Sequence, residues 1–213
     1  EFRRVLFRSM PLSDADVRDR ALFGIILFTG CRPSEIRTAW DRDITPYGTL
    51  GHWHKATSKT GESHDVPIPA CVMAWVQAWR AVRDTRSPYL FPGQDPMQPL
   101  SECGVRVRWS IIRTGLHIQG LWTYDLRRTI ATYLHNDLRF DHKFVRAVLN
   151  HYQGESEDHY IVVAFDHLIP VIEAYAEWLL ALKGGSHATP QPVQSGLDRK
   201  STRLNSSHTV ISY

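Results

Sequence analysis

The sequence has few cysteines, no long hydrophobic run and no obvious group of metal ligands. Cys31, Cys71 and Cys103 are scattered over 213 residues without the spacing of a zinc site. An odd number of cysteines without an export signal is typical of reduced thiols in a cytoplasm. No apolar segment approaches the roughly 20 residues that a membrane span requires. We therefore expect a cytoplasmic protein with no cofactor, no metal and no membrane partner.

The sequence also lacks a strong excess of positive charge. Its formal net charge is +3, but residues 1–9 and 197–213 each contribute +2, which leaves the remainder at −1. Total charge therefore gives no indication of nucleic-acid binding, and any basic surface must come from local clustering. No Gly-x-x-x-x-Gly-Lys-Ser/Thr loop is present, so a nucleotide-driven reaction is not indicated.

The two ends of the chain differ in character from the rest. Residues 1–9 show no capping or periodic pattern that continues into Met10, and residues 199–208 resemble translated adapter or vector sequence. A hydrophobic content of 43% over this length suffices for one domain with a core. We predict a non-native leader at 1–9, one domain at 10–184, and a disordered linker with a non-native tail at 185–213.

Periodic patterns predict a mainly helical protein with a small antiparallel sheet of three strands, an α+β fold. The first helix is expected at 13–28, where Ser13 and Asp16 form a capping box and Gly30 stops the helix. Further helices are expected at 34–40, 70–85, 101–114, about 123–134 and 170–184, and one more is expected to end at 150–151. Strands are expected at 43–45, 50–56 and 63–68. His52 and His54 share one face of the second strand, but no third metal ligand is evident.

Two adjacent arginines stand near the start of one predicted helix. Thr123 occupies the expected N-cap position, which places Arg127 and Arg128 in the first turn. The helix dipole disfavours cations there, so the pair requires an explanation. An anion held by the helix N-terminus and a guanidinium would supply one, and phosphate suits both. The alternative is a solvated arginine pair on an amphipathic helix.

Three separated blocks resemble the catalytic domain of the tyrosine recombinases, the phage integrase family. The blocks are Thr29–Ile36, Asp125–Thr129, and Asn150-His151 followed nine residues later by Tyr160. The resemblance runs roughly from residue 12 to residue 182 and includes two arginines that are 95 residues apart. Tyr124 departs from the pattern, because the family usually has histidine there. The resemblance implies that residues 10–184 are a tyrosine-recombinase catalytic domain.

The resemblance also implies roles for individual residues. Arg32, Arg127 and His151 would bind a phosphate, and Tyr160 would attack it to give a covalent 3′-phosphotyrosine. Tyr152 is the nearest competing nucleophile. A lysine on the second hairpin would protonate the leaving oxygen; Lys59 matches this position, and Lys55 is its nearest competitor. Glu35 and Tyr124 would support the site.

The implied partner is double-stranded DNA, with a homotetramer on paired sites for the full-length protein in a bacterial or phage setting. Arg106, Arg108 and Arg128 are candidate DNA contacts. Family members also clamp DNA with an N-terminal core-binding domain, which we expect to be missing here. Two alternatives remain: a catalytically impaired DNA-binding or assembly module, favoured by Tyr124 and by that missing domain, and an enzyme resembling type IB topoisomerases.

Overall fold

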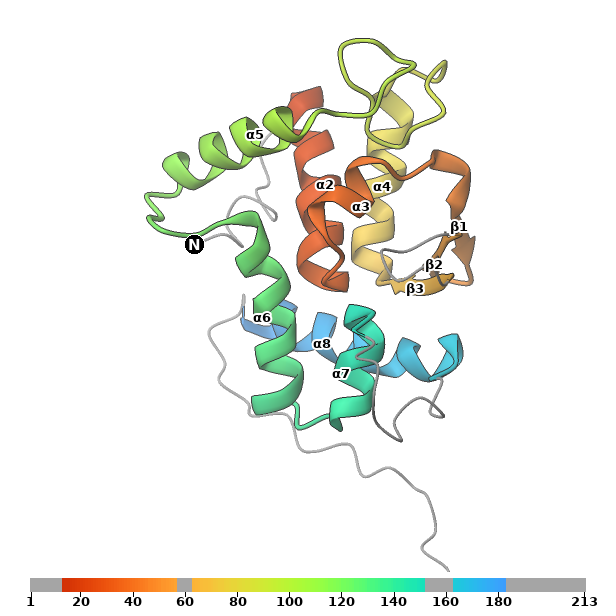
Figure 1. The fold of residues 1–213 in the computed structure, drawn as a ribbon, viewed down its shortest axis with the longest axis vertical. Helices are drawn as coiled ribbons and strands as arrows, with labels where there is room; N and C mark the ends of the chain where they lie inside the picture. Colours follow the sequence, from red (N-terminus) through yellow and green to blue (C-terminus); the bar gives the residue numbers. More distant parts are fainter. Residues whose placement is uncertain (1–12, 57–62, 152–162, 183–213) are drawn as a thin grey trace, which may run out of the picture.

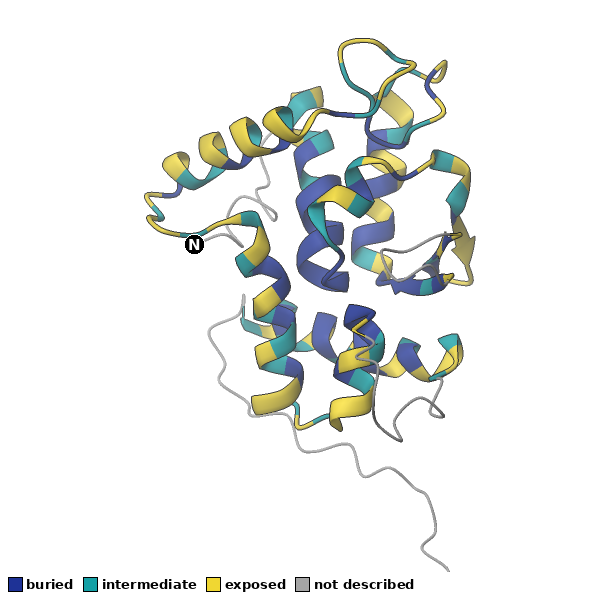
Figure 2. Ribbon diagram, viewed as in Figure 1, coloured by how far each residue is buried: buried dark blue, intermediate teal, exposed yellow. Residues whose placement is uncertain are grey.

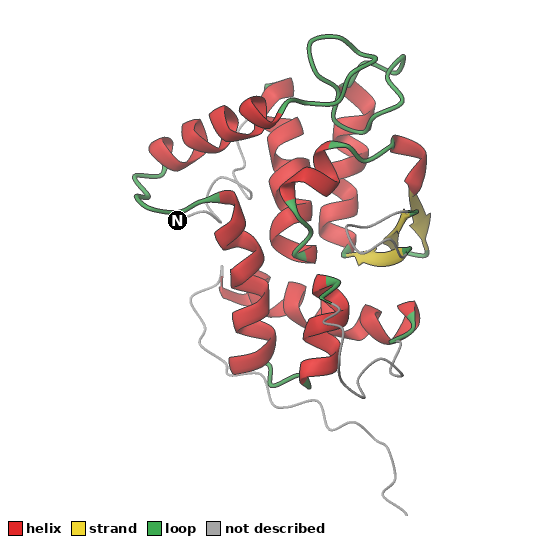
Figure 3. Cartoon of the chain, viewed as in Figure 1, coloured by secondary structure: helices red, strands yellow, loops and turns green. Residues whose placement is uncertain are grey.

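The computed structural model describes residues 13–56, 63–151 and 163–182 (Figure 1). Figure 3 shows helices and one small sheet within these ranges. The helices are α2 (Asp14–Thr29), α3 (Pro33–Arg37), α4 (Ala70–Val82), α5 (Glu102–Gly115), α6 (Thr123–Asn136), α7 (His142–Leu149) and α8 (Phe165–Ala181), with a short 3-10 helix η1 (Asp41–Asp43). The predicted fold class, mainly α with a small antiparallel sheet, is confirmed.

Helix α2 is the central element of the core. Ser13 caps its N-terminus by accepting the Asp16 amide, and the Asp16 carboxylate accepts the Ser13 amide at 3.2 Å, as the capping box predicts. Every residue from Ala21 to Thr29 is buried, and Figure 2 shows the helix in dark blue along most of its length. A helix buried on all sides must be covered by neighbours. Helix α4 packs along it, and α6 meets its C-terminal part.

The sheet consists of β1 (Ile44–Tyr47), β2 (Leu50–Lys55) and β3 (His64–Ile68) in the order β1-β2-β3, all antiparallel. Successive side chains of a strand point to opposite faces. On β2, Trp53 and Lys55 are buried on one face, and His54 is exposed on the other. Pro67 lies on β3, an edge strand, as expected for a residue without an amide hydrogen.

Helices α6, α7 and α8 form a second layer below α2 and the sheet in Figure 1. The rings of Tyr133 on α6 and Trp178 on α8 are 4.3 Å apart, and Tyr175 packs edge-on against Phe28 of α2. The first contact holds the second layer together, and the second joins the two layers into one core. No helix within the described ranges is both long enough and apolar enough to span a bilayer.

Several predicted helix boundaries are wrong. Helix α3 ends at Arg37 and α4 at Val82, each three residues early. Trp122, not Thr123, is the N-cap of α6, because the Asp125 carboxylate accepts the Trp122 amide at 2.7 Å and starts the helix one residue sooner. Helix α8 begins at Phe165 rather than Pro170; burial of its apolar face outweighs the hydrogen bond that Pro170 removes.

Candidate functional site

Arg127 lies in the second turn of α6 and is 6% exposed. Its guanidinium donates one hydrogen bond to the Gly30 carbonyl and another, of 2.5 Å, to the Leu149 carbonyl. Gly30 caps the C-terminus of α2, and Leu149 is the last residue of α7. Helix C-termini carry partial negative charge, so two of them stabilise this buried cation. The predicted placement of Arg127 in the first turn, at a helix N-terminus, is therefore wrong.

Gly30 determines how closely the three helices meet around Arg127. It has a φ of 65°, in the left-handed region that favours glycine. A Cβ atom at this position would lie 2.7 Å from the Ile130 side chain and 2.8 Å from the Leu149 side chain. Any larger residue would force the Ile130 and Leu149 side chains to shift and would disturb the packing of α6 and α7 against the end of α2. The glycine thus keeps both carbonyl acceptors within reach of one guanidinium.

Arg32 belongs to a network of three charged side chains. It is the N-cap residue of α3, and its Nη1 lies 2.7 Å from Glu35 Oε1. The other Glu35 oxygen accepts the Arg32 amide at 3.0 Å and the Lys55 ammonium at 3.1 Å. Burial opposes ionisation of Glu35, but the charge of Lys55 and the hydrogen bonds from Arg32 outweigh it and lower the pKa to about 2. The expected contact between Arg32 and Glu35 is present, and Lys55 joins it.

His151 follows Asn150, the left-handed C-cap residue of α7. Its pKa lies below the usual histidine value because burial, and then the charges of Arg127 and Arg32, disfavour the imidazolium. A neutral imidazole can still donate one N–H. The pKa of Arg127 is likewise lowered by burial and by Arg32. Arg32, Arg127 and His151 therefore act on one another electrostatically, although they come from three separate segments.

The charges of this cluster do not balance within the described part of the chain. Arg32, Lys55 and Arg127 are cationic, and Glu35 is the carboxylate that contacts the first two. The charge of Glu35 also raises the pKa of Arg127, against the effect of burial. Two positive charges remain beside a neutral imidazole. Such a group of planar and hydrogen-bonding donors suits an anion with several oxygens, and phosphate is the best match.

His64 makes a contact beside the site that its position in a strand pattern does not predict. Its Nε2 donates to the Ala147 carbonyl at 2.9 Å and so connects β3 to the end of α7. Burial, followed by the charge of Lys55, lowers its pKa to about 4, so the ring is neutral at pH 7. The pairing of Lys55 with His64 across the hairpin brings the two together. The strand pattern places His64 in the sheet but does not indicate that it lies beside the cationic site.

The other predicted site residues fall into two groups: some lie outside the described residues, and the rest are exposed or bound to a neighbouring carboxylate. Lys59, Tyr152 and Tyr160 lie outside the described residues. Tyr124 is 53% exposed in the first turn of α6, and its phenol contributes to the pKa of Arg127. The candidate DNA contacts differ, because Arg106 is exposed, Arg108 binds the buried Asp19 at 2.6 Å, and Arg128 binds Asp125 at 3.0 Å.

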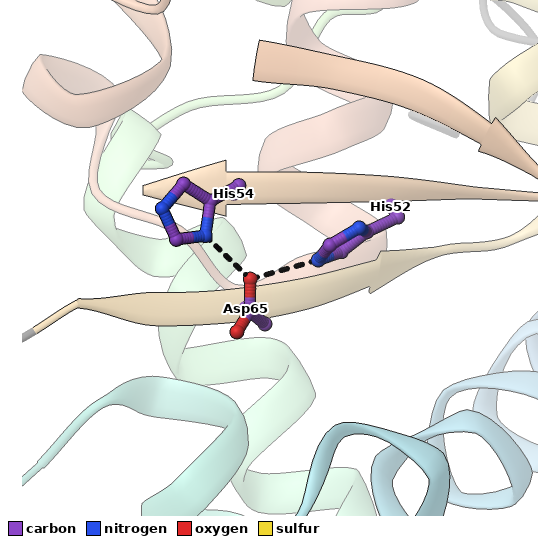
Figure 4. A group of neighbouring side chains, drawn as sticks. All are labelled: His52, His54 and Asp65. Carbon is purple, nitrogen blue, oxygen red and sulfur yellow. Dashed lines mark hydrogen bonds and ion pairs between the residues drawn. The ribbon is translucent and has the colours of Figure 1, made fainter. Parts of the chain in front are cut away.

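The expectation that His52 and His54 lack a third metal ligand is wrong. The carboxylate of Asp65, from β3, lies between the two rings (Figure 4). One ligand atom from each residue lies within 4.8 Å of the other two. This cluster is on the opposite face of β2 from Lys55, so it is separate from the cationic site.

Comparison with solved structures shows the same fold in known recombinases. The XerH site-specific recombinase bound to its difH substrate aligns with a TM-score of 0.61 and 22% identity, over 83% of this chain and 51% of that one. XerA recombinase gives 0.57 and 18%, over 83% and 62% of the two chains. The Tn1549 transposon integrase in complex with circular intermediate DNA gives 0.52 and 17%, over 76% and 57%. The chain thus spans about half to three-fifths of these proteins.

No curated protein sequence matches this chain. The sequence profile of the phage integrase family matches residues 5–167, which is well over half of the chain and includes all three blocks singled out in the sequence. Arg32, Arg127 and His151 of the charged cluster come one from each of these blocks. On this match, the chain belongs to the phage integrase family.

Proposed function

We propose that this chain is the catalytic domain of a site-specific DNA recombinase that cleaves and rejoins strands through a covalent 3′-phosphotyrosine. The observation that carries the proposal is the cluster of Arg32, Arg127 and His151, in which the described residues leave two positive charges unbalanced. Membership of the phage integrase family supports it.

The proposed reaction needs no oxidant or nucleotide. The Tyr160 phenol gives its proton to water, and its oxygen forms a bond to the phosphorus. The bond from phosphorus to the 5′ oxygen breaks, and that oxygen takes a proton from Lys59. Diester and phenolate together bring two negative charges to the pentacoordinate transition state. The cluster's two unbalanced positive charges match them, and the planar guanidinium groups can each bind two oxygens.

We retain Lys59, which lies outside the described residues, as the proposed proton donor, and the contacts of Lys55 support this choice. The Lys55 ammonium is buried and bound to Glu35, and it lies 4.8 Å from the centre of the Trp53 ring. These contacts suit a positioning residue that holds Glu35, and through Glu35 the guanidinium of Arg32. A lysine held in this way is poorly placed to deliver a proton to a departing strand.

The proposed partner is double-stranded DNA, bound by a homotetramer on paired sites in the full-length protein. Arg106 and Arg128 are exposed and suit contacts with backbone phosphates. Arg108 is a weaker candidate than the sequence suggested. Together with Arg18, it forms an ion pair with Asp19, which is 4% exposed.

A covalent-trapping experiment tests the proposal without knowledge of the target site. A pool of nicked duplexes with randomised sequence is incubated with the protein, so that a cleaved fragment diffuses away and leaves an adduct. We expect an adduct at the 3′ end that peptide mapping places on Tyr160. Tyr160→Phe should abolish it while DNA binding persists, and Tyr152→Phe should retain it. An adduct on Tyr152 would overturn the assignment of Tyr160 as the nucleophile. DNA binding without any adduct would support the alternative that the chain is a catalytically impaired DNA-binding module.

The tyrosine at position 124 leads to a separate prediction. Tyr124 is exposed beside Arg127, where its hydroxyl can donate a hydrogen bond to an anion. Tyr124→His should therefore cleave as fast as the wild type or faster, measured as the rate of adduct formation in single-turnover conditions. A rate about tenfold lower, which corresponds to a barrier about 1.4 kcal/mol higher, would show that the tyrosine has a role of its own. Tyr124→Phe controls for loss of the hydroxyl.

A further inference from the structure

Two histidines and one aspartate converge on the outer face of the sheet. His52 Nε2 lies 2.7 Å and His54 Nδ1 2.8 Å from the same oxygen, Oδ1 of Asp65. Figure 4 shows both rings turned toward this carboxylate, His52 and His54 from β2 and Asp65 from β3. All three ligand atoms lie within 4.8 Å of one another.

Strand geometry explains the convergence. Residues two apart on a strand project from the same face, which places both imidazoles together. In the antiparallel register His54 is opposite Asp65, and His52 is opposite Pro67. The carboxylate therefore stands beside one histidine and diagonal to the other, within reach of both rings. The site is built into paired strands rather than into a loop.

The surroundings hold the first imidazole in place and leave the cluster accessible. The His52 ring lies 4.5 Å from the Phe165 ring, at the start of α8, and 6.4 Å from the Tyr47 ring. The side chains of His52, Asp65 and His54 are 30%, 39% and 51% exposed. A solvated ion can therefore reach the three ligands directly, and water can complete its coordination.

We propose that His52, His54 and Asp65 form a binding site for a divalent transition-metal ion of the Zn²⁺ type. The ion would bind His52 Nε2, His54 Nδ1 and a carboxylate oxygen of Asp65, with water in the fourth position. Imidazole nitrogen with carboxylate is a donor set that suits Zn²⁺ and its neighbours. In tetrahedral coordination by Zn²⁺, with bonds of about 2.0 Å to nitrogen and oxygen, the ligand atoms are roughly 3.3 Å apart. The observed separations require only small side-chain shifts to reach it.

The metal would connect β2 to β3 close to the start of α8, on the side of the hairpin away from Arg32 and Arg127. It would take no part in the proposed DNA chemistry. Its role would be to hold together the two strands that flank residues 57–62.

The test uses the full chain, stripped of metal with a chelator and titrated with ZnCl₂ in a calorimeter. We expect saturable binding of one ion per chain. His54→Ala and Asp65→Asn should each weaken the affinity by at least about tenfold, the lower end of what loss of even an outer-sphere partner costs. Asp65→Asn is the sharper variant, because an amide oxygen can still accept a histidine hydrogen bond but binds a metal ion poorly. His54 is half exposed, so its loss should leave the fold intact, which circular dichroism checks.

His142→Ala is the matched control. His135 and His142 form another pair of neighbouring imidazoles, with ring centres 4.7 Å apart, and belong to no metal-ligand group among the residues described. The control should bind Zn²⁺ as the wild type does. The Co²⁺ complex of the wild-type protein should show the visible absorption of tetrahedral nitrogen and oxygen coordination. The proposal fails if the wild type shows no saturable binding, if Asp65→Asn binds unchanged, if His142→Ala loses the ion, or if the Co²⁺ spectrum shows thiolate ligation.

Discussion

Replacing Arg127 with methionine should lower the free energy of unfolding by about 2–4 kcal/mol, because two buried carbonyls lose their donor. The side chain donates to the carbonyls of Gly30 and Leu149, at the ends of two helices. Methionine has a similar length but no polar hydrogen. Part of this loss is offset, because the variant no longer has to bury the charged guanidinium. The melting temperature should fall by roughly 5–15 °C for a domain of this size.

Arg128→Met is the matched control for this substitution. Arg128 is adjacent in sequence, but its side chain is 80% exposed and binds only Asp125 among the contacts described. Its replacement should change stability by no more than about 0.5 kcal/mol. It should nevertheless weaken DNA binding if Arg128 contacts a phosphate. Equal melting temperatures for the two variants would contradict the role assigned to Arg127.

The second large effect is expected for Glu35→Gln, which should destabilise the protein by about 3 kcal/mol at pH 7. The substitution removes the carboxylate that binds both Lys55 and Arg32, and it leaves the Lys55 ammonium, 7% exposed, without a counter-charge. Chemical denaturation measures the loss. Glu173→Gln, on an exposed turn of α8, is the control and should be neutral within about 0.5 kcal/mol.

The effect of Glu35→Gln should depend on pH in a defined direction. The pKa of Glu35 is about 2 in the folded protein against an ordinary value of 4.5, so the folded state favours the ionised form. The stabilisation is therefore complete above pH 4.5 and is lost as the pH falls toward 2. The difference in stability between wild type and Glu35→Gln should narrow over this window. A difference that stays constant down to pH 3 would contradict the assignment.

A double-mutant cycle separates the ion pair from other causes. If the cost of Glu35→Gln comes from an unpaired ammonium, adding Lys55→Met should restore part of the stability. The double variant should then be more stable than the sum of the two single effects predicts. Simple additivity would instead show that Glu35 and Lys55 stabilise the fold independently. The same variants, tested for adduct formation, would show whether Lys55 positions Arg32.

Local signals in the sequence were enough for the fold class and the family. The Ser13–Asp16 capping box and Gly30 specify both ends of α2 because each satisfies hydrogen bonds at its own helix terminus. The strand pattern located the three-stranded sheet, and the blocks around Arg32 and Arg127 identified the family that the profile match shows. Pro170 gave a wrong start for α8. A proline removes one local hydrogen bond, whereas the stability of α8 comes from burying its apolar face against other segments.

The order of residues along the chain shows which chemical groups are available: two arginines, a histidine and a glutamate in separated blocks, and two histidines spaced for one strand face. The groups that they contact depend on how the segments pack. Arg127 binds the ends of α2 and α7, Lys55 rather than a neighbour of Arg32 completes the Glu35 network, and Asp65 joins His52 and His54. These partners lie far apart in the chain or across a hairpin whose register depends on the packed core. Helical and strand periodicity describes one segment at a time, so it cannot show which segments meet.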